Sequence, residues 1–144
     1  MKLMVVNLLL LALAFGFAGF LIETAGKSFQ AKRFVYAGDQ FFWGIPFLPI
    51  YSAGGLLMHL AIEFSLGFPW FLTLSLTWLV VCTWEYFAGL FCHKALNKKF
   101  WDYSDHKINL HGYICVRNSL LWLFLVILYY FLLFPKVDVF LMNS

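Results

Sequence analysis

The sequence predicts an all-α integral membrane protein with four transmembrane helices in one bundle. Hydrophobic residues make up 63% of the 144 residues and charged residues only 12%, against about 25% in ordinary soluble domains. The mean hydropathy is +0.83. The apolar residues gather in four runs, each near the ~20 residues that cross a ~30 Å hydrocarbon core as a helix. Lipid is therefore the expected solvent for most of the chain. The net charge of +3 is too small and too scattered to indicate a nucleic-acid partner.

The four expected helices cover about 3–22, 49–66, 70–92 and 116–134, in a single transmembrane domain, 1–144. The first begins like a signal peptide, but its apolar run continues to Ile22, which favours a retained helix. The second is the weakest, because Gly54-Gly55 and nearby prolines could interrupt it. Pro69 separates the second helix from the third, and Pro135 ends the fourth.

Basic residues in the short connections predict the orientation. The two long loops, 23–44 and 93–115, hold seven of them, against two on the other side (Lys27, Lys32, Arg33, Lys94, Lys98, Lys99 and Lys107, against Lys2 and Lys136). The positive-inside rule then places both loops in the cytoplasm and both termini outside, in the cell (cytoplasmic) membrane.

The segment 40–52 is aromatic, apolar and interrupted by Pro46 and Pro49. A continuous helix through these prolines would lose hydrogen bonds and clash. The segment either lies at the membrane interface as an aromatic belt or re-enters the membrane against protein.

Carboxylates inside apolar runs should face protein or water, since a charge at mid-membrane costs about 2.5–3.5 kcal/mol or more. Glu23 and Glu85 each share a helical face with small residues, and Arg117 is their expected counter-charge. His59 and Glu63, one helical turn apart, form an outer polar pair. All of these residues could also be structural clamps between helices.

The densest polar passage, Trp101 to Cys115, includes Trp101, Asp102, Tyr103 and Asn109. With Glu23, Glu85 and Arg117, these residues form the candidate binding site near the cytoplasmic face. The histidines and aspartates of this passage do not match H-E-x-x-H, and the cysteines contain no C-x-x-C pair, so we expect no metal and no other cofactor. We also expect no catalytic residue, because no nucleophile with a base and an orienting acid can be identified.

An ordered set of short motifs extends along nearly the whole chain: Gly19-x-x-x-Glu23, Arg33-Phe34, Leu48-Pro49-Ile50-Tyr51, Glu85-Tyr86-x-x-Gly89, Trp101-Asp102-Tyr103-Ser104 and Asn109-Leu110-x-Gly112-x-Ile114-Cys115. The set resembles the CmpB-like family of small bacterial membrane proteins, labelled "putative ABC-transporter type IV" or "putative ABC transporter permease". Two positions depart from the family pattern: Ile45 separates Gly44 from Pro46, and Ser52 stands where glycine is expected.

The resemblance implies a multi-pass transporter or permease component. The chain has no G-x-x-x-x-G-K-[ST] loop, so a separate ATPase subunit would be required. Four spans are few for a complete pathway, which suggests a homo-oligomer, and membrane lipids are further expected partners. The alternative is a membrane scaffold or assembly partner without transport activity, and a membrane-embedded enzyme is less favoured.

Overall fold

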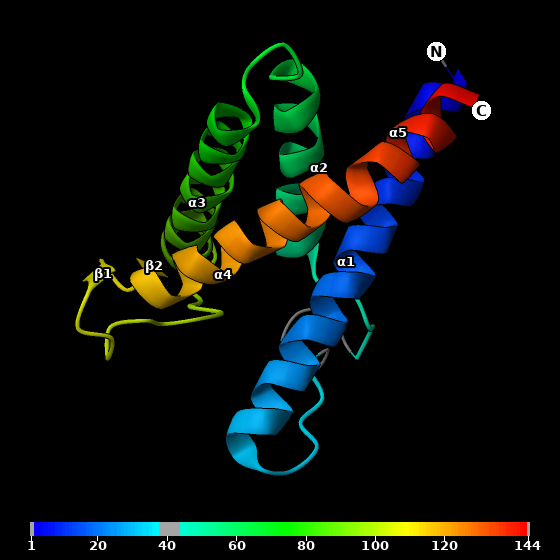
Figure 1. Cartoon of the computed structure of the whole chain (residues 1–144). Coiled ribbons are helices and arrows are strands. Elements are labelled where there is room, and N and C mark those ends of the chain that lie inside the picture. The colour runs from blue at the N-terminus through cyan, green and yellow to red at the C-terminus, as the bar shows by residue number, and fades with distance from the viewer. Residues whose placement is uncertain (1, 38–43, 144) are drawn as a thin grey trace. The chain divides into compact units, whose positions relative to one another are not determined.

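The computed structural model describes residues 2–37 and 44–143, and these are mainly helical (Figure 1). Its elements follow in the order α1 (Lys2–Ala31), α2 (Pro49–Phe64), α3 (Trp70–Ala95), β1 (Asn109–Leu110), β2 (Ile114–Cys115), α4 (Val116–Leu128), the π-helix η2 (Tyr129–Leu133) and α5 (Phe134–Asn143). The predicted helical membrane protein is confirmed to this extent. The two short strands pair antiparallel, with Asn109 opposite Cys115 and Leu110 opposite Ile114.

Three stretches of the described chain are long and apolar enough to cross a membrane: Val5–Ala31, Trp70–Ala95 and Val116–Val139. The predicted second helix, 49–66, is not among them. It forms α2, whose 16 residues extend only about 24 Å at 1.5 Å per residue, less than the ~30 Å core. Gly54-Gly55 does not interrupt α2, which continues through both glycines.

The chain divides into two compact units, Met1–Leu56 and Leu57–Ser144, with the boundary inside α2. Each unit is described by itself below.

In the first unit, the chain after α1 folds back along the helix. Val35 donates its N–H to the Ser28 hydroxyl at 2.9 Å, and Ala37 donates to the Thr24 hydroxyl at 3.3 Å. Farther along, the N–H of Leu48 donates to the carbonyl of Gly16, midway along α1, at 3.1 Å. The returning chain therefore lies beside progressively earlier turns of α1.

The predicted interfacial or re-entrant segment, 40–52, lies partly outside the described residues, which resume at 44. From 44 to 48 the chain is irregular, and α2 begins at Pro49. Ser52 donates its hydroxyl to the carbonyl of Ala12 at 2.8 Å. The residue that departs from the family pattern thus ties the first turn of α2 to α1.

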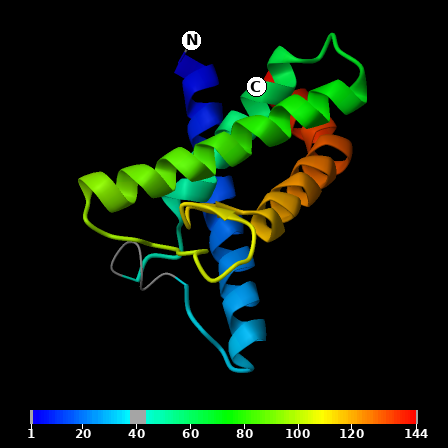
Figure 2. The same cartoon turned by 90° about the vertical axis from the view of Figure 1, so that its left-hand side faces the viewer.

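In the second unit, α3 packs against α4. Val81 and Val126 are completely buried, and the indole of Trp78 donates to the carbonyl of Ser119 at 2.7 Å. The last helical stretch contains a widened turn at η2, in which the N–H of Phe134 bonds to the carbonyl of Tyr129. The long connection between α3 and α4, residues 96–115, returns from the end of α3 to the start of α4 (Figure 2).

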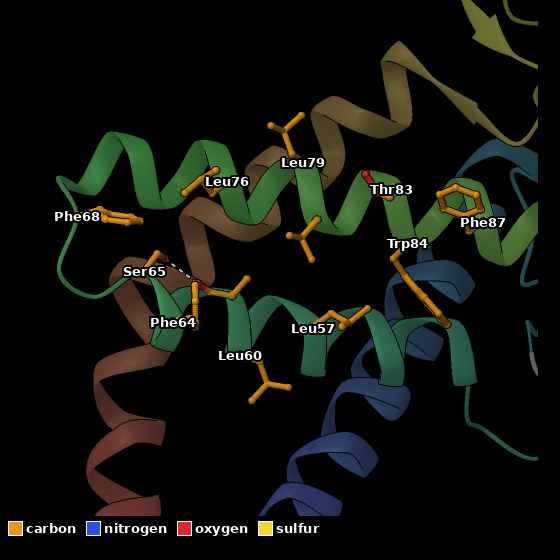
Figure 3. Close-up of a pocket in the computed structure, with 12 residues that line it drawn as sticks. Leu57, Leu60, Phe64, Ser65, Phe68, Leu76, Leu79, Thr83, Trp84 and Phe87 are labelled. Atoms are coloured by element: carbon orange, nitrogen blue, oxygen red, sulfur yellow. Dashed lines mark hydrogen bonds between the residues drawn. The ribbon is translucent and has the colours of Figure 1, made fainter.

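An apolar groove of about 820 Å³ separates the second half of α2 from α3. Figure 3 shows Leu57, Leu60 and Phe64 along one side, and Leu76 and Leu79 along the other. Such a surface fits lipid tails or a neighbouring membrane helix.

Candidate functional site

The connection 96–115 is an ordered structure held against α3. Its strands β1 and β2 are joined by a tight turn, in which Tyr113 donates its N–H to the carbonyl of Leu110 at 3.1 Å. Both central residues have positive φ, 54° at His111 and 73° at Gly112, as a type I′ turn requires. A Cβ on Gly112 would approach the Ser104 hydroxyl and the Asp102 carboxylate. Glycine is therefore required here both for its backbone conformation and for its lack of a side chain.

Glu85 of α3 is at the centre of this arrangement, with only 4% of its surface exposed. Its Oε1 accepts hydrogen bonds from the Tyr103 hydroxyl, at 3.2 Å, and from the Asn118 side-chain amide. Its Oε2 accepts from the Trp122 indole at 3.0 Å. One carboxylate thus joins α3, the 96–115 connection and α4. Each of these three donors is uncharged, so these contacts are directional hydrogen bonds.

The sequence reasoning named Arg117 as the counter-charge and missed Asn118 and Trp122. Arg117 is exposed, whereas Trp122 is buried and Asn118 half-buried. Neighbouring positions on a helix differ by about 100° in direction, so Arg117 and Asn118 cannot both face α3. The four-residue spacing of Asn118 and Trp122, which puts them on one face, was the signal in the sequence that could have identified them.

Asp102 organises the first turn of the connection. Its Oδ1 accepts from the backbone N–H of Ser104 at 3.0 Å and from the Ser104 hydroxyl at 2.5 Å. Its Oδ2 is 2.8 Å from the ammonium of Lys99. These partners hold the pKa of the Asp102 carboxyl well below its usual range, with the Lys99 hydrogen bond as the largest cause and the two from Ser104 next. Asp102 therefore acts as a charged anchor within the loop.

Trp101 and Asn109 complete the framework. The Trp101 indole donates to the carbonyl of Tyr113 at 2.9 Å. Asn109 accepts from the N–H of Gly112 at 2.9 Å and donates to the carbonyl of His106 at 2.8 Å. Of the predicted site residues, Glu85, Trp101, Asp102, Tyr103 and Asn109 thus belong to one connected assembly.

The C-terminal half of α3 supplies further contacts that the sequence reasoning did not single out. Tyr113 pairs its hydroxyl with His93 at 2.7 Å, and Tyr86 pairs with His111 at 2.9 Å. At Gly89, an added Cβ would lie 3.1 Å from Trp101 and 3.2 Å from Tyr113. The loop thus packs closely on α3 at Gly89, which has no side chain.

Glu23 belongs to the first unit, and its described contacts lie within that unit. Its Oε2 accepts a hydrogen bond from the Tyr51 hydroxyl at 3.1 Å, and its Oε1 is 3.6 Å from the ammonium of Lys27. Glu23 therefore connects α1 with the first turn of α2.

The small residues of α1 are covered by residues of the same unit. A Cβ on Gly16 would overlap the Phe47 ring, and one on Gly19 would overlap Tyr51. The small-residue face that Glu23 shares is therefore packed inside the first unit.

The outer polar pair is also in contact: the His59 Nε2 lies 3.4 Å from a carboxylate oxygen of Glu63. Within the described residues, no group of three or more histidines, cysteines or acids could hold a metal ion. At Glu85, hydrogen bonds attach the 96–115 connection to α3 and α4.

A family model described as "Putative ABC-transporter type IV" matches residues 10–144. No curated protein and no solved structure matched the chain.

Proposed function

Since the chain belongs to the putative ABC-transporter type IV family, we propose that it is the membrane-embedded component of an ABC transporter and that residues 96–115 dock a separate ATPase subunit. Three apolar helices long enough to cross the bilayer support the membrane location. The proposed component binds no ATP itself and carries no catalytic site.

The observation that carries this proposal is the anchoring of an exposed basic loop to two apolar helices through buried Glu85. A movement imposed on the loop would be transmitted through Tyr103 to Glu85 and from there to Asn118 of α4. A loosely attached loop would absorb the same movement. Transport driven by a separate ATPase requires this kind of mechanical connection.

The outer surface of the loop suits a protein partner. Lys98 and Lys107 are exposed, and the apolar side chains of Ile108 and Leu110 are exposed at 69% and 52%. Apolar side chains surrounded by charges are typical of protein contact surfaces.

The proposed topology has four crossings, with both termini outside and the segments 23–44 and 93–115, which include the last residues of α1 and α3, in the cytoplasm. Leu48 lies beside Gly16. Gly16 is six residues before Ile22, where the apolar run of α1 ends, so at 1.5 Å per residue it lies about 9 Å inside the cytoplasmic end of that run. If α2 starts at that depth, its length of about 24 Å suffices to reach the opposite surface. The irregular segment 44–48 would then be re-entrant and packed against α1, as irregular backbone within a membrane must be.

The test is purification of the full chain in mild detergent with an ATPase encoded by a neighbouring gene. We expect the two to co-purify, and the double variant K107E/I108S to abolish co-purification at unchanged thermal stability. The matched control is Lys136→Glu, an exposed lysine in α5, which should retain the partner. If no ATPase binds, or if both variants behave alike, the docking proposal is wrong.

The apolar groove between α2 and α3 favours a second candidate, a membrane scaffold without transport activity. Such a scaffold, or a homo-oligomer, would use the groove and not the α1 glycines. Reconstitution with the ATPase distinguishes the two functions, because only the transporter component would show ATP-dependent movement of a solute.

A further inference from the structure

The second unit contains a buried histidine that the proposed transport role does not use. His59 lies in the second half of α2 and has no exposed surface. Its ring is enclosed by aromatic neighbours, with the ring centroids of Tyr129 and Phe134 at 6.2 Å and 5.4 Å. An imidazole in such surroundings costs free energy unless both of its nitrogens have partners.

The two ring nitrogens have different surroundings. Nδ1 lies 2.8 Å from the Tyr129 hydroxyl, which can donate or accept a hydrogen bond. Nδ1 therefore has a partner whether or not it carries a proton. Nε2 has no hydrogen-bond partner among the described residues. The nearest acid to it is Glu63, with a carboxylate oxygen 3.4 Å away.

The surroundings of the ring can hold the charged imidazolium. In the neutral ring one nitrogen carries a proton and the other does not, whereas in the imidazolium both are donors. The imidazolium has an acceptor at each nitrogen: a protonated Nδ1 donates to the Tyr129 hydroxyl, and a protonated Nε2 faces the Glu63 carboxylate. A shift of a few tenths of an ångström brings Nε2 and the Glu63 oxygen to an ordinary hydrogen-bond distance.

A route for the proton is present as well. Glu63 is the penultimate residue of α2, next to the turn that leads to α3, and its side chain is 40% exposed. Asp138 of α5 lies near enough to His59 to act on it electrostatically. Glu63, Asp138 and Tyr129 are the titratable groups that face His59 from its own helix, from α5 and from η2.

The backbone at Tyr129 is specialised too. η2 is a π-helical turn that directly precedes Phe134-Pro135. Proline has no N–H to offer the preceding turn, and a π-turn inserts one extra residue, which changes the direction of the side chains on either side of it. π-turns of this kind are frequent at functional sites. Here the wide turn begins at the residue that holds His59.

We propose that His59, Glu63 and Tyr129 form a proton-binding site, which takes up its proton at the surface end of α2 by way of Glu63. A proton from water binds the lone pair of Nε2, forming an N–H bond. The resulting positive charge is balanced by the Glu63 carboxylate, and nothing is oxidised or reduced.

The test is a pH titration of the full chain in detergent micelles, with the side-chain nitrogens of histidine labelled with ¹⁵N and observed by NMR between pH 4 and 9. We expect His59 to change reversibly from neutral to charged within this range. In Glu63→Gln the midpoint should fall by about one pH unit, because an opposite charge within about 4–6 Å stabilises the imidazolium. His93 and His111 are internal controls. Each is paired with a tyrosine, as His59 is, but these tyrosines are Tyr113 and Tyr86, so the change at Glu63 should not move the midpoints of His93 and His111.

Two results would overturn the proposal. In the wild-type chain, a His59 that keeps one protonation state from pH 4 to 9 binds no exchangeable proton. In Glu63→Gln, an unchanged His59 midpoint, or an equal shift at His93, means that Glu63 does not contribute. If Glu63→Gln fails to fold, Glu63→Asp replaces it, and a midpoint equal to that of wild type then counts against direct contact. Neither readout depends on transport or on an ATPase.

Discussion

Removal of the Glu85 carboxylate should detach the 96–115 connection from α3 and α4. Glu85→Ala leaves three donors without this acceptor: the Tyr103 hydroxyl, the Asn118 amide and the Trp122 indole. Loss of a buried hydrogen bond costs about 1–3 kcal/mol, and of these contacts the one from Trp122 is buried, so we expect a loss of at least about 1 kcal/mol in the free energy of unfolding.

Glu85→Gln is the sharper change, because it keeps one oxygen for Tyr103 and Asn118 but presents an NH₂ group to the Trp122 indole. Two donors then face each other, at a cost of about 1–3 kcal/mol. Trp122→Phe removes that conflict. Each single change removes the hydrogen bond between the Trp122 indole and residue 85, and the double change removes it only once. The double-mutant cycle should therefore show a coupling of about 1 kcal/mol or more between these two positions.

Two assays report the effect. A thiol-reactive dye added during heating follows the exposure of the free cysteines, of which Cys115 lies buried at the end of the hairpin. Limited trypsin digestion at exposed Lys107 follows detachment of the loop below the melting temperature. If Glu85→Gln matches wild type in both assays, and the coupling to Trp122→Phe is below about 0.5 kcal/mol, then Glu85 does not anchor the loop.

Three further changes test the surrounding structure. Gly112→Ala should destabilise the hairpin by about 1 kcal/mol or more, since it places a side chain at positive φ and against Asp102; the thiol-dye assay measures this, and an unchanged melting temperature would contradict it. The folded protein lowers the pKa of the Asp102 carboxyl. The stability that this carboxylate contributes is therefore fully present above its pKa in the unfolded chain, about 3.9, and is lost as the pH falls below that value. Trypsin protection of the loop should accordingly persist at pH 5, and Asp102→Asn should weaken it at pH 7; equal protection in both chains at pH 7 would count against the anchor. Gly16→Leu should lower the melting temperature strongly because the new side chain overlaps the Phe47 ring, whereas Gly26→Leu, where nothing lies within 4 Å, should not; equal effects would show that the close packing of α1 is not needed.

The apolar helices were predictable because length and composition alone determine them. The runs expected at 70–92 and 116–134 are found as apolar stretches at Trp70–Ala95 and Val116–Val139. The prediction that Pro135 ends the last helix is wrong, because α5 continues through this proline to Asn143. The second helix was placed correctly along the chain, but a helix starting at Pro49 and ending at Phe64 is too short to count as a crossing by its length. The depth that we propose for it rests on the contact of Leu48 with Gly16, which no periodicity in the sequence could predict.

The candidate site was predictable in part. A carboxylate within an apolar run identified Glu85, and polar density identified Trp101 to Asn109. The partners on α4 were not foreseen. Arg117 was expected to pair with Glu85 because it carries the opposite charge, but the neighbouring Asn118 makes the contact. The turn at His111 was equally beyond prediction, since a residue other than glycine with positive φ is held there by contacts distant in sequence.

The partners of Glu85 also constrain how the chain is made. Its three donors lie 18, 33 and 37 residues downstream, so Glu85 is synthesised before any of them. An ionised carboxylate in the centre of an isolated span would oppose insertion by about 2.5–3.5 kcal/mol or more. The donors from α4 and from the connection offset this cost, so we expect α3 to be most stable in the membrane once α4 has joined it.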